Sequence, residues 1–173
     1  MTDDPRIPAL PYSTVDPELL EQMKQRFAET PLHALLGLEI LPPDPDDPNL
    51  SVVTMPVTPA AFGSTGNLHG GAIATLVDVS CASAASRASV FHPGQNTLVT
   101  ADMHVRYLGR PKGDVVRCEG RVVRAGRSLI VVEGRVLDDL DNVLAVADFA
   151  AMVVTLREPL RPELRTDDSA VEM

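Results

Sequence analysis

The chain has 173 residues, of which 45% are apolar and only 3% aromatic, so its core has to be built mainly from Val, Leu, Ile and Ala. This length suits one folded domain with extended ends. The net charge of −9 argues against a nucleic-acid partner, because phosphate neutralisation requires a basic surface.

The N-terminal third is rich in proline, with eleven of the fifteen prolines in residues 1–59. We interpret residues 1–30 as an extension that contains one short helix. Asp16 and Pro17 are typical of a helix start, and the helix should end before Pro31. Residues 32–41 then predict a turn and a short strand, and residues 50–57 a second strand.

The segment from His69 to Arg87, HGGAIATLVDVSCASAASR, consists almost entirely of small or apolar residues. A helix that is apolar on all sides must be buried, and its small side chains let a sheet pack very close to it. We predict that this helix begins near Gly70 and runs to about Arg87. Asp78 is its only acidic residue, which makes a functional role plausible.

The remaining sequence alternates between apolar and polar residues and predicts four strands at 97–107, 113–124, 128–138 and 142–156. The connections are too short for crossover helices, so the sheet should be antiparallel. In the first of these strands, strict alternation places Thr100 on the face opposite Met103 and Val105. The charged residues 157–173 predict a disordered tail.

Two features of this pattern resemble a known family. His69-Gly70-Gly71, six further residues and Asp78 resemble the HGG-x6-D motif of the phenylacetate-degradation (PaaI-like) hotdog thioesterases. The segments around Thr100, around Gly113-Asp114 and at Gly126 to Ser128 resemble their later strands and turns. The resemblance implies an α+β hotdog fold over residues 31–156, with an antiparallel sheet wrapped around one long central helix. It also implies hydrolysis of an acyl-coenzyme A thioester.

The chemistry of such a site needs a base or nucleophile and donors for the oxygen that becomes negative. Asp78 is the candidate general base or nucleophile, and the backbone amides of Gly70 and Gly71 at the helix N-terminus are the candidate donors. Thr100 matches a position that orients water in the family, and His69 completes the catalytic candidates.

Each candidate also has a purely structural interpretation. Asp78 could be a buried acid satisfied by a hydroxyl such as that of Thr75, and His69 could only hold the start of the helix. The family carries Asn six residues before the motif histidine, where this chain has Gly63. Asn67 is therefore a candidate substitute that contacts the substrate.

Residues 106–135 contain eight of the fifteen basic side chains and only three acids. These cations either receive the phosphates of coenzyme A or form a solvated sheet face. Substrate-binding candidates lie at the predicted turns and comprise Arg110, Lys112, Arg124, Arg127 and Ser128.

Asp78 follows Gly70 by eight residues, about 12 Å along a helix, which is too far for both to act on one carbonyl. The resemblance implies a homodimer with antiparallel helices, in which the acid of one subunit faces the glycine amide of the other. A dimer of dimers is the further expectation.

No metal or other cofactor is expected, because Cys81 and Cys118 lie far apart and no histidine has ligand spacing. We expect two buried thiols, no membrane association and a cytoplasmic location, since the chain shows no apolar run of about 18 residues. Two other functions remain open. One is a hotdog acyl-CoA hydratase or dehydratase, and the other is a non-catalytic acyl-CoA binding module.

Overall fold

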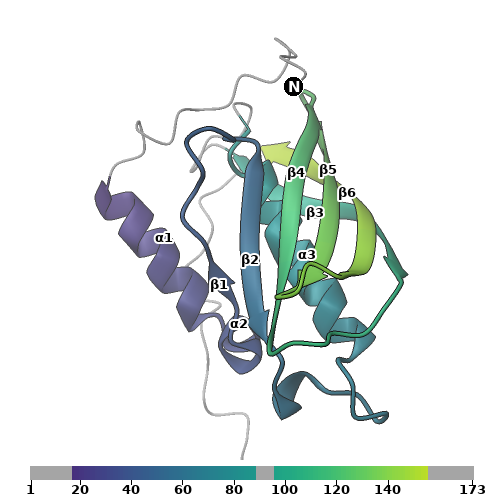
Figure 1. The fold of residues 1–173 in the computed structure, drawn as a ribbon. Coiled ribbons are helices and arrows are strands. Elements are labelled where there is room, and N and C mark those ends of the chain that lie inside the picture. Colours follow the sequence, from purple (N-terminus) through teal and green to yellow (C-terminus); the bar gives the residue numbers. More distant parts are fainter. Residues whose placement is uncertain (1–16, 89–95, 156–173) are drawn as a thin grey trace, which may run out of the picture.

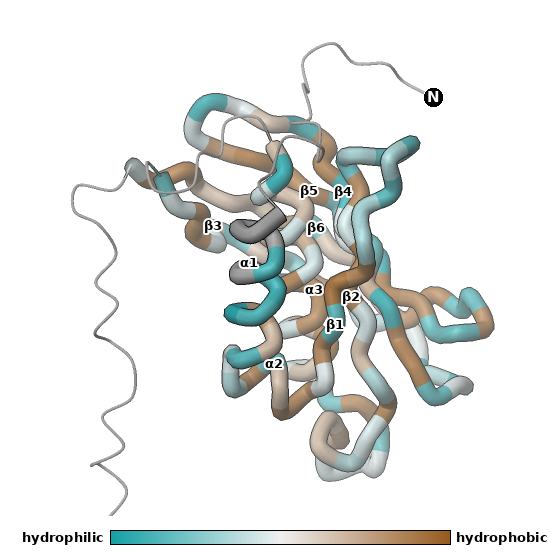
Figure 2. Tube along the Cα trace, turned by 90° about the vertical axis from the view of Figure 1, so that its left-hand side faces the viewer, coloured by the Kyte–Doolittle hydropathy of each residue, from teal (hydrophilic) through white to brown (hydrophobic). Residues whose placement is uncertain are grey.

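A computed structural model of the chain describes residues 17–88 and 96–155 (Figure 1). The expected Asp16 cap and the predicted tail at 157–173 lie outside the described residues. The described part of the chain begins with helix α1 (Pro17–Glu29), which agrees with the predicted N-terminal helix. In Figure 1, α1 lies beside strands β1 and β2, away from the long helix α3, and Figure 2 shows that α1 is mostly hydrophilic.

All strands belong to one six-stranded antiparallel sheet with the order β1-β2-β4-β5-β6-β3. The strands are β1 (Glu39–Ile40), β2 (Leu50–Pro56), β3 (Asn96–Tyr107), β4 (Val115–Ala125), β5 (Leu129–Asp138) and β6 (Val143–Thr155). The sheet curls around α3 (Gly70–Ala85), as Figure 1 shows. This confirms the predicted hotdog fold.

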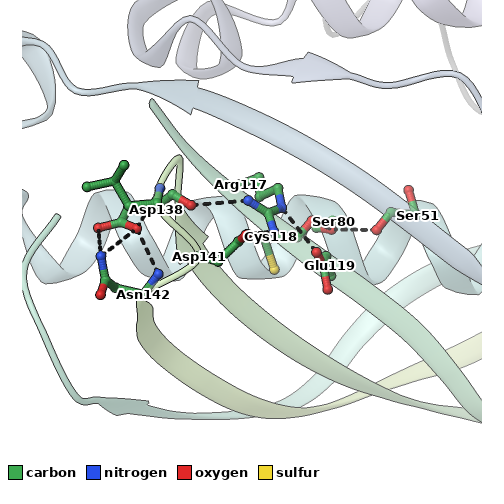
Figure 3. A network of polar contacts seen from close by, with 9 residues as sticks. Ser51, Ser80, Arg117, Cys118, Glu119, Asp138, Asp141 and Asn142 are labelled. Atoms are coloured by element: carbon green, nitrogen blue, oxygen red, sulfur yellow. Dashed lines mark hydrogen bonds and ion pairs between the residues drawn. The ribbon is translucent and has the colours of Figure 1, made fainter. Parts of the chain in front are cut away.

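The central helix packs closely on β4 and β5, where Gly120 and Gly134 are cross-strand partners. A Cβ atom at Gly120 would lie 2.8 Å from the carbonyl oxygen of Ser80, and one at Gly134 would lie 3.0 Å from the Cys81 sulfur. Ser80 uses the short distance to donate a hydrogen bond of 2.8 Å to the Cys118 carbonyl (Figure 3). The expectation of a sheet very close to a small-residue helix is therefore correct.

The region after α1 differs from our expectation of a turn and a strand. Pro31 begins a second helix, α2 (Pro31–Leu36), because proline at the first helical position has no amide hydrogen to leave unpaired. Gly37 ends this helix in a left-handed conformation with φ of +63°. Only Glu39–Ile40 then form a strand, and a short 3-10 helix, η2 (Pro59–Ala61), follows β2.

Strand β3 contains an irregularity that changes which side chains face the helix. Thr100 pairs with Ala151 and Asp102 pairs with Ala150, so Ala101 is an extra residue in the ladder. Because Ala151 is buried in the core, its partner Thr100 also faces the helix. Thr100 therefore shares a face with Met103 and Val105, and our expectation from strict alternation was wrong at this β-bulge.

A buried carboxylate joins the two loops at one end of the sheet. Asp138 is fully buried and accepts hydrogen bonds from the backbone amides of Lys112, Leu140 and Asn142 and from the Asn142 side chain. Figure 3 shows Asn142 folded against it. Burial alone would raise the pKa of Asp138, but the donors outweigh it and lower the pKa to about 2.

Replacing Asp138 by Asn should lower the free energy of unfolding at neutral pH. It should also make this free energy depend less on pH in the acid range. The folded pKa of about 2 lies below the ordinary value of 3.8, so the carboxylate stabilises the fold above pH 4 and loses this effect between pH 4 and pH 2. The free energy of unfolding, measured with urea between pH 4 and pH 2, should change less in Asp138→Asn than in the wild type. The exposed Asp46→Asn is the matched control, and an equally steep acid dependence in both variants would contradict the assignment.

Candidate active site

The start of α3 presents one accessible free amide. His69 is the N-cap, and its ring Nδ1 accepts the Gly71 N–H at 2.8 Å. The His69 N–H donates to the Ala61 carbonyl, and the Ile73 N–H donates to the His69 carbonyl. In the described part of the chain this leaves the amides of Gly70 and Ala72 without acceptors, and Ala72 is buried. The half-buried Gly70 amide is thus the available donor at the positive end of the helix.

The two glycines of the motif therefore have different tasks. Gly71 is engaged by the His69 ring, and a Cβ atom there would lie 2.8 Å from His69 Nδ1. At Gly70 the nearest atom to an added Cβ would be the Tyr107 ring at 3.6 Å, which is an ordinary contact. Gly71 makes room for the cap, whereas Gly70 leaves the approach to its amide open. The acceptor role of Nδ1 leaves the proton of a neutral His69 on Nε2.

Asp78 and Thr100 form the second half of the site. Thr100 Oγ1 donates a hydrogen bond of 2.7 Å to Asp78 Oδ1, across from β3 to α3. Asp78 is half-buried, and its Oδ2 accepts no hydrogen bond from the described residues. Thr75 donates to the Gly71 carbonyl at 2.9 Å instead, so it does not satisfy the carboxylate. One carboxylate oxygen is fixed and the other remains free.

Tyr107 is a contact that sequence reasoning missed. Its hydroxyl donates to the Gly70 carbonyl at 3.1 Å and so joins the end of β3 to the first residue of α3. The chain has two tyrosines, and the position of this one on the helix-facing side of β3 was the available signal.

The loop before the helix accounts for the departure from the family pattern. The Gly63 N–H donates to the Asn67 carbonyl at 2.8 Å, and the Asn67 side chain donates to the Thr65 carbonyl at 3.0 Å. A Cβ atom at Gly63 would lie 3.1 Å from the His69 ring, which would have to move by a few tenths of an ångström. Asn67 thus closes its own loop, and Gly63 leaves space for the capping histidine.

The basic candidates fall into two groups at opposite ends of β4. Arg110 and Lys112 precede this strand, and Arg124 and Arg127 lie at its far end, about 36 Å away for an extended strand of 11 residues. Within the described ranges, none of these four exposed side chains makes a hydrogen bond or ion pair. By contrast, three neighbouring arginines are paired with acids: Arg106, Arg117 and Arg121. Ser128 is exposed in the turn after Arg127, where its carbonyl accepts the Val153 amide.

The cysteines are free and buried, as predicted. Its hydrogen bond with Cys118, together with burial, raises the pKa of the Cys81 thiol far above its ordinary value. Cys81 therefore stays protonated and is no candidate nucleophile. Among residues 17–88 and 96–155, no group of histidine, cysteine or acidic side chains is arranged to hold a metal, and no helix could span a membrane.

Comparison with known proteins identifies one family model. It is described as the thioesterase superfamily and matches residues 65–145, which include the start of α3, Asp78 and Thr100. This part of the chain is therefore similar to the thioesterase superfamily. The similarity supports acyl-thioester hydrolysis in general. Among curated proteins no sequence matches the chain.

Several solved structures share this fold, and most of them are described as thioesterases. A thioesterase from Haemophilus influenzae is 24% identical with a TM-score of 0.70, over 80% of this chain and 92% of its own. Zebrafish thioesterase superfamily member 2 is 24% identical with a TM-score of 0.67, over 80% and 99%. The E. coli PaaI protein of the phenylacetic acid degradation operon is 17% identical with a TM-score of 0.65, over 78% and 92%.

Proposed function

We propose that this protein hydrolyses acyl-coenzyme A thioesters at sites shared between the two subunits of a homodimer. The observation that supports this most is the Asp78–Thr100 hydrogen bond, which leaves Asp78 Oδ2 free at a half-buried position. The free amide of Gly70 supplies the complementary group, a donor for a developing oxyanion. The similarity of residues 65–145 to the thioesterase superfamily agrees with this assignment.

In the proposed reaction Asp78 acts in one of two ways. As a general base, it takes a proton from a water molecule whose oxygen attacks the thioester carbonyl. As a nucleophile, it attacks the carbonyl itself to give an anhydride that water then opens. In both cases the Gly70 N–H binds the negative oxygen, the carbon–sulfur bond breaks and the thiolate leaves to become the free thiol of coenzyme A.

The length of the helix and one edge of the sheet support the proposed dimer. Asp78 and Gly70 lie about 12 Å apart along α3, which is too far for one carbonyl. Among the described residues β3 is the last strand of the sheet, so its outer edge is open for pairing with a second copy. A two-fold axis near the middle of β3 would bring Asp78 and Thr100 of one subunit toward the partner subunit's Gly70.

The same axis would bring the two basic groups together. Arg124 and Arg127 lie near the Thr100 end of the sheet. The strand pairings show this: Ala125 pairs with Ile130, and Ile130 and Thr100 both pair with Ala151. Arg110 lies just beyond the Tyr107 end. In the proposed dimer, an antiparallel pairing of the β3 edges would bring Arg110 and Lys112 of one subunit toward Arg124 and Arg127 of the partner subunit. Such a cluster suits the phosphates of coenzyme A.

Replacing Asp78 by Asn should lower kcat about 100-fold or more, because the amide keeps the shape but loses the basic oxygen. Thr100→Val should cause a smaller loss, since the carboxylate remains but is less well oriented. Both are measured by release of free thiol, which also separates hydrolysis from hydration. Asp102→Asn on the opposite face of β3 is the matched control. Near-native turnover of a folded Asp78→Asn dimer would contradict the mechanism.

A single-turnover reaction in ¹⁸O-labelled water separates the two roles of Asp78. Label in the enzyme's own carboxylate indicates an anhydride, because water then attacks either carbonyl of the intermediate. Label found only in the released acid favours the general base.

Mixing two inactive variants should restore activity if each site takes residues from both subunits. A dimer of one Asp78→Asn chain and one Gly70→Val chain contains one site with both groups intact, and a second site with neither. After subunit exchange, such mixed dimers should have about half the wild-type activity per dimer. No recovery in a mixture shown by native mass spectrometry to contain mixed dimers would contradict the shared site. The same measurement distinguishes a dimer from the dimer of dimers.

Reversing the charge of Arg127 with Arg127→Glu should raise KM for acyl-coenzyme A about tenfold, because a hydrogen bond to a charged group typically contributes about 1.5–3 kcal/mol. KM for an acyl-N-acetylcysteamine, which lacks the nucleotide, should change little. Arg135→Glu is the matched control, since Arg135 is exposed on strand β5 instead of a turn. An equal effect of Arg127→Glu on both substrates would argue against phosphate binding.

A further inference from the structure

One of two depressions on the described surface adjoins the site, and the other does not. The larger, of about 510 Å³, lies on the sheet face that points away from α3, and its lining includes Glu119, Arg121, Glu133 and Asp148. Its arginines and acids alternate, and Arg106 is paired with Asp148 at 3.6 Å. This depression therefore holds compensated charges, and none of the catalytic candidates lines it.

The smaller depression is an apolar groove between α2, η2 and the first turns of α3. It measures about 220 Å³. We call it the α2 groove, and its lining comprises Leu32, Leu35, Leu36, Ala60, Ala61, Phe62, His69, Gly71, Ala72 and Thr75. Eight of these ten residues carry hydrocarbon side chains or none at all, so the groove suits an apolar group.

Three large apolar side chains on the walls of the groove are exposed in the single chain. Leu35 is 62% exposed, Leu32 is 49% exposed and Phe62 is 39% exposed. Leu32 and Leu35 lie one turn apart on α2, and Phe62 follows η2 directly. Covering these side chains removes apolar surface from water, which favours occupation of the groove.

The polar atoms at the helix end of the groove are already engaged. The Thr75 hydroxyl donates to the Gly71 carbonyl at 2.9 Å, and His69 Nδ1 accepts the Gly71 amide. The helix end of the groove therefore offers no free hydroxyl. The side-chain polar atom of its lining that is not engaged there is Nε2 of His69. A charged or strongly polar ligand group would lose its hydration here without gaining partners.

The groove adjoins the reacting centre of the proposed site. Gly71 lines it and directly follows Gly70, whose amide is the proposed oxyanion donor. A carbonyl held at the Gly70 amide thus has the mouth of the groove beside it.

We propose that the α2 groove binds the acyl group of the substrate and selects uncharged, apolar acyl chains. This inference rests on the proposed thioesterase function, because it takes the Gly70 amide as the carbonyl site. Leu35, the most exposed of the wall residues, contributes most to the length preference, since a longer chain covers more of its side chain. A two-carbon acyl group covers less of this apolar lining than a longer chain does.

The binding of unreactive thioether analogues tests the groove without requiring hydrolysis. S-octyl-coenzyme A and S-ethyl-coenzyme A share the nucleotide and differ only in alkyl length. Calorimetry on the full-length wild type should show S-octyl-coenzyme A binding about tenfold more tightly or better, given the favourable transfer of each buried methylene group. Leu35→Ala should reduce this ratio several-fold, and Leu35→Asp should abolish it, with affinity for S-ethyl-coenzyme A unchanged. Leu140→Asp is the matched control, because Leu140 is 64% exposed in the turn between β5 and β6.

Failure of this inference can be told apart from failure of the proposed function. A wild type that binds both analogues equally, or a Leu35→Asp variant that keeps the octyl preference, would overturn the groove assignment. If Leu35→Asp instead changed the oligomeric mass in solution, a second copy of the chain would occupy the groove, and the acyl assignment would also be wrong. A wild type that prefers the octyl analogue but releases no thiol from any acyl-coenzyme A would keep the binding site and refute hydrolysis.

Discussion

The close contact between α3 and the centre of the sheet is the constraint on which the site depends. Gly120 and Gly134 let the helix backbone approach β4 and β5, and Ser80 holds it there with a hydrogen bond to Cys118. With one side of the helix fixed in this way, the other side is directed toward β3 and α2. Asp78 can then meet Thr100, and the first turn of the helix is left open.

The backbone amides at the start of α3 have two different roles. Some hold the structure, and one is proposed to take part in the reaction. A helix N-terminus has several unpaired N–H groups, and here His69 satisfies one through its side chain while Ala61 accepts the His69 amide itself. The remaining donor at Gly70 is held from the other side by Tyr107, which binds the carbonyl of the same residue. In the proposed reaction this amide is fixed before any substrate arrives, so little reorganisation is needed.

Sequence periodicity predicted the strands and the central helix well, because each depends on a local pattern of apolar residues. The separate roles of Gly70 and Gly71 were not predictable, since they depend on where the His69 ring points. The bulge at Ala101 was missed because an extra residue is defined only by the partner strand. The α2 groove brings together segments that are distant in sequence. We had interpreted Pro31 only as the end of the first helix, so the second helix that lines the groove was not predicted.

The bulge at Ala101 also fixes the register of β3. A strand with a regular ladder can slide by two residues and still present the same face, but one with a single extra residue fits its neighbour in only one place. The orientation of the Asp78 carboxylate is thereby linked to the registry of an edge strand some twenty residues away in sequence. Loss of Ala101 would make the ladder regular, because Thr100 and Asp102 would then be consecutive and face the consecutive partners Ala151 and Ala150. The strand would keep its faces but lose the irregularity that allows only one register.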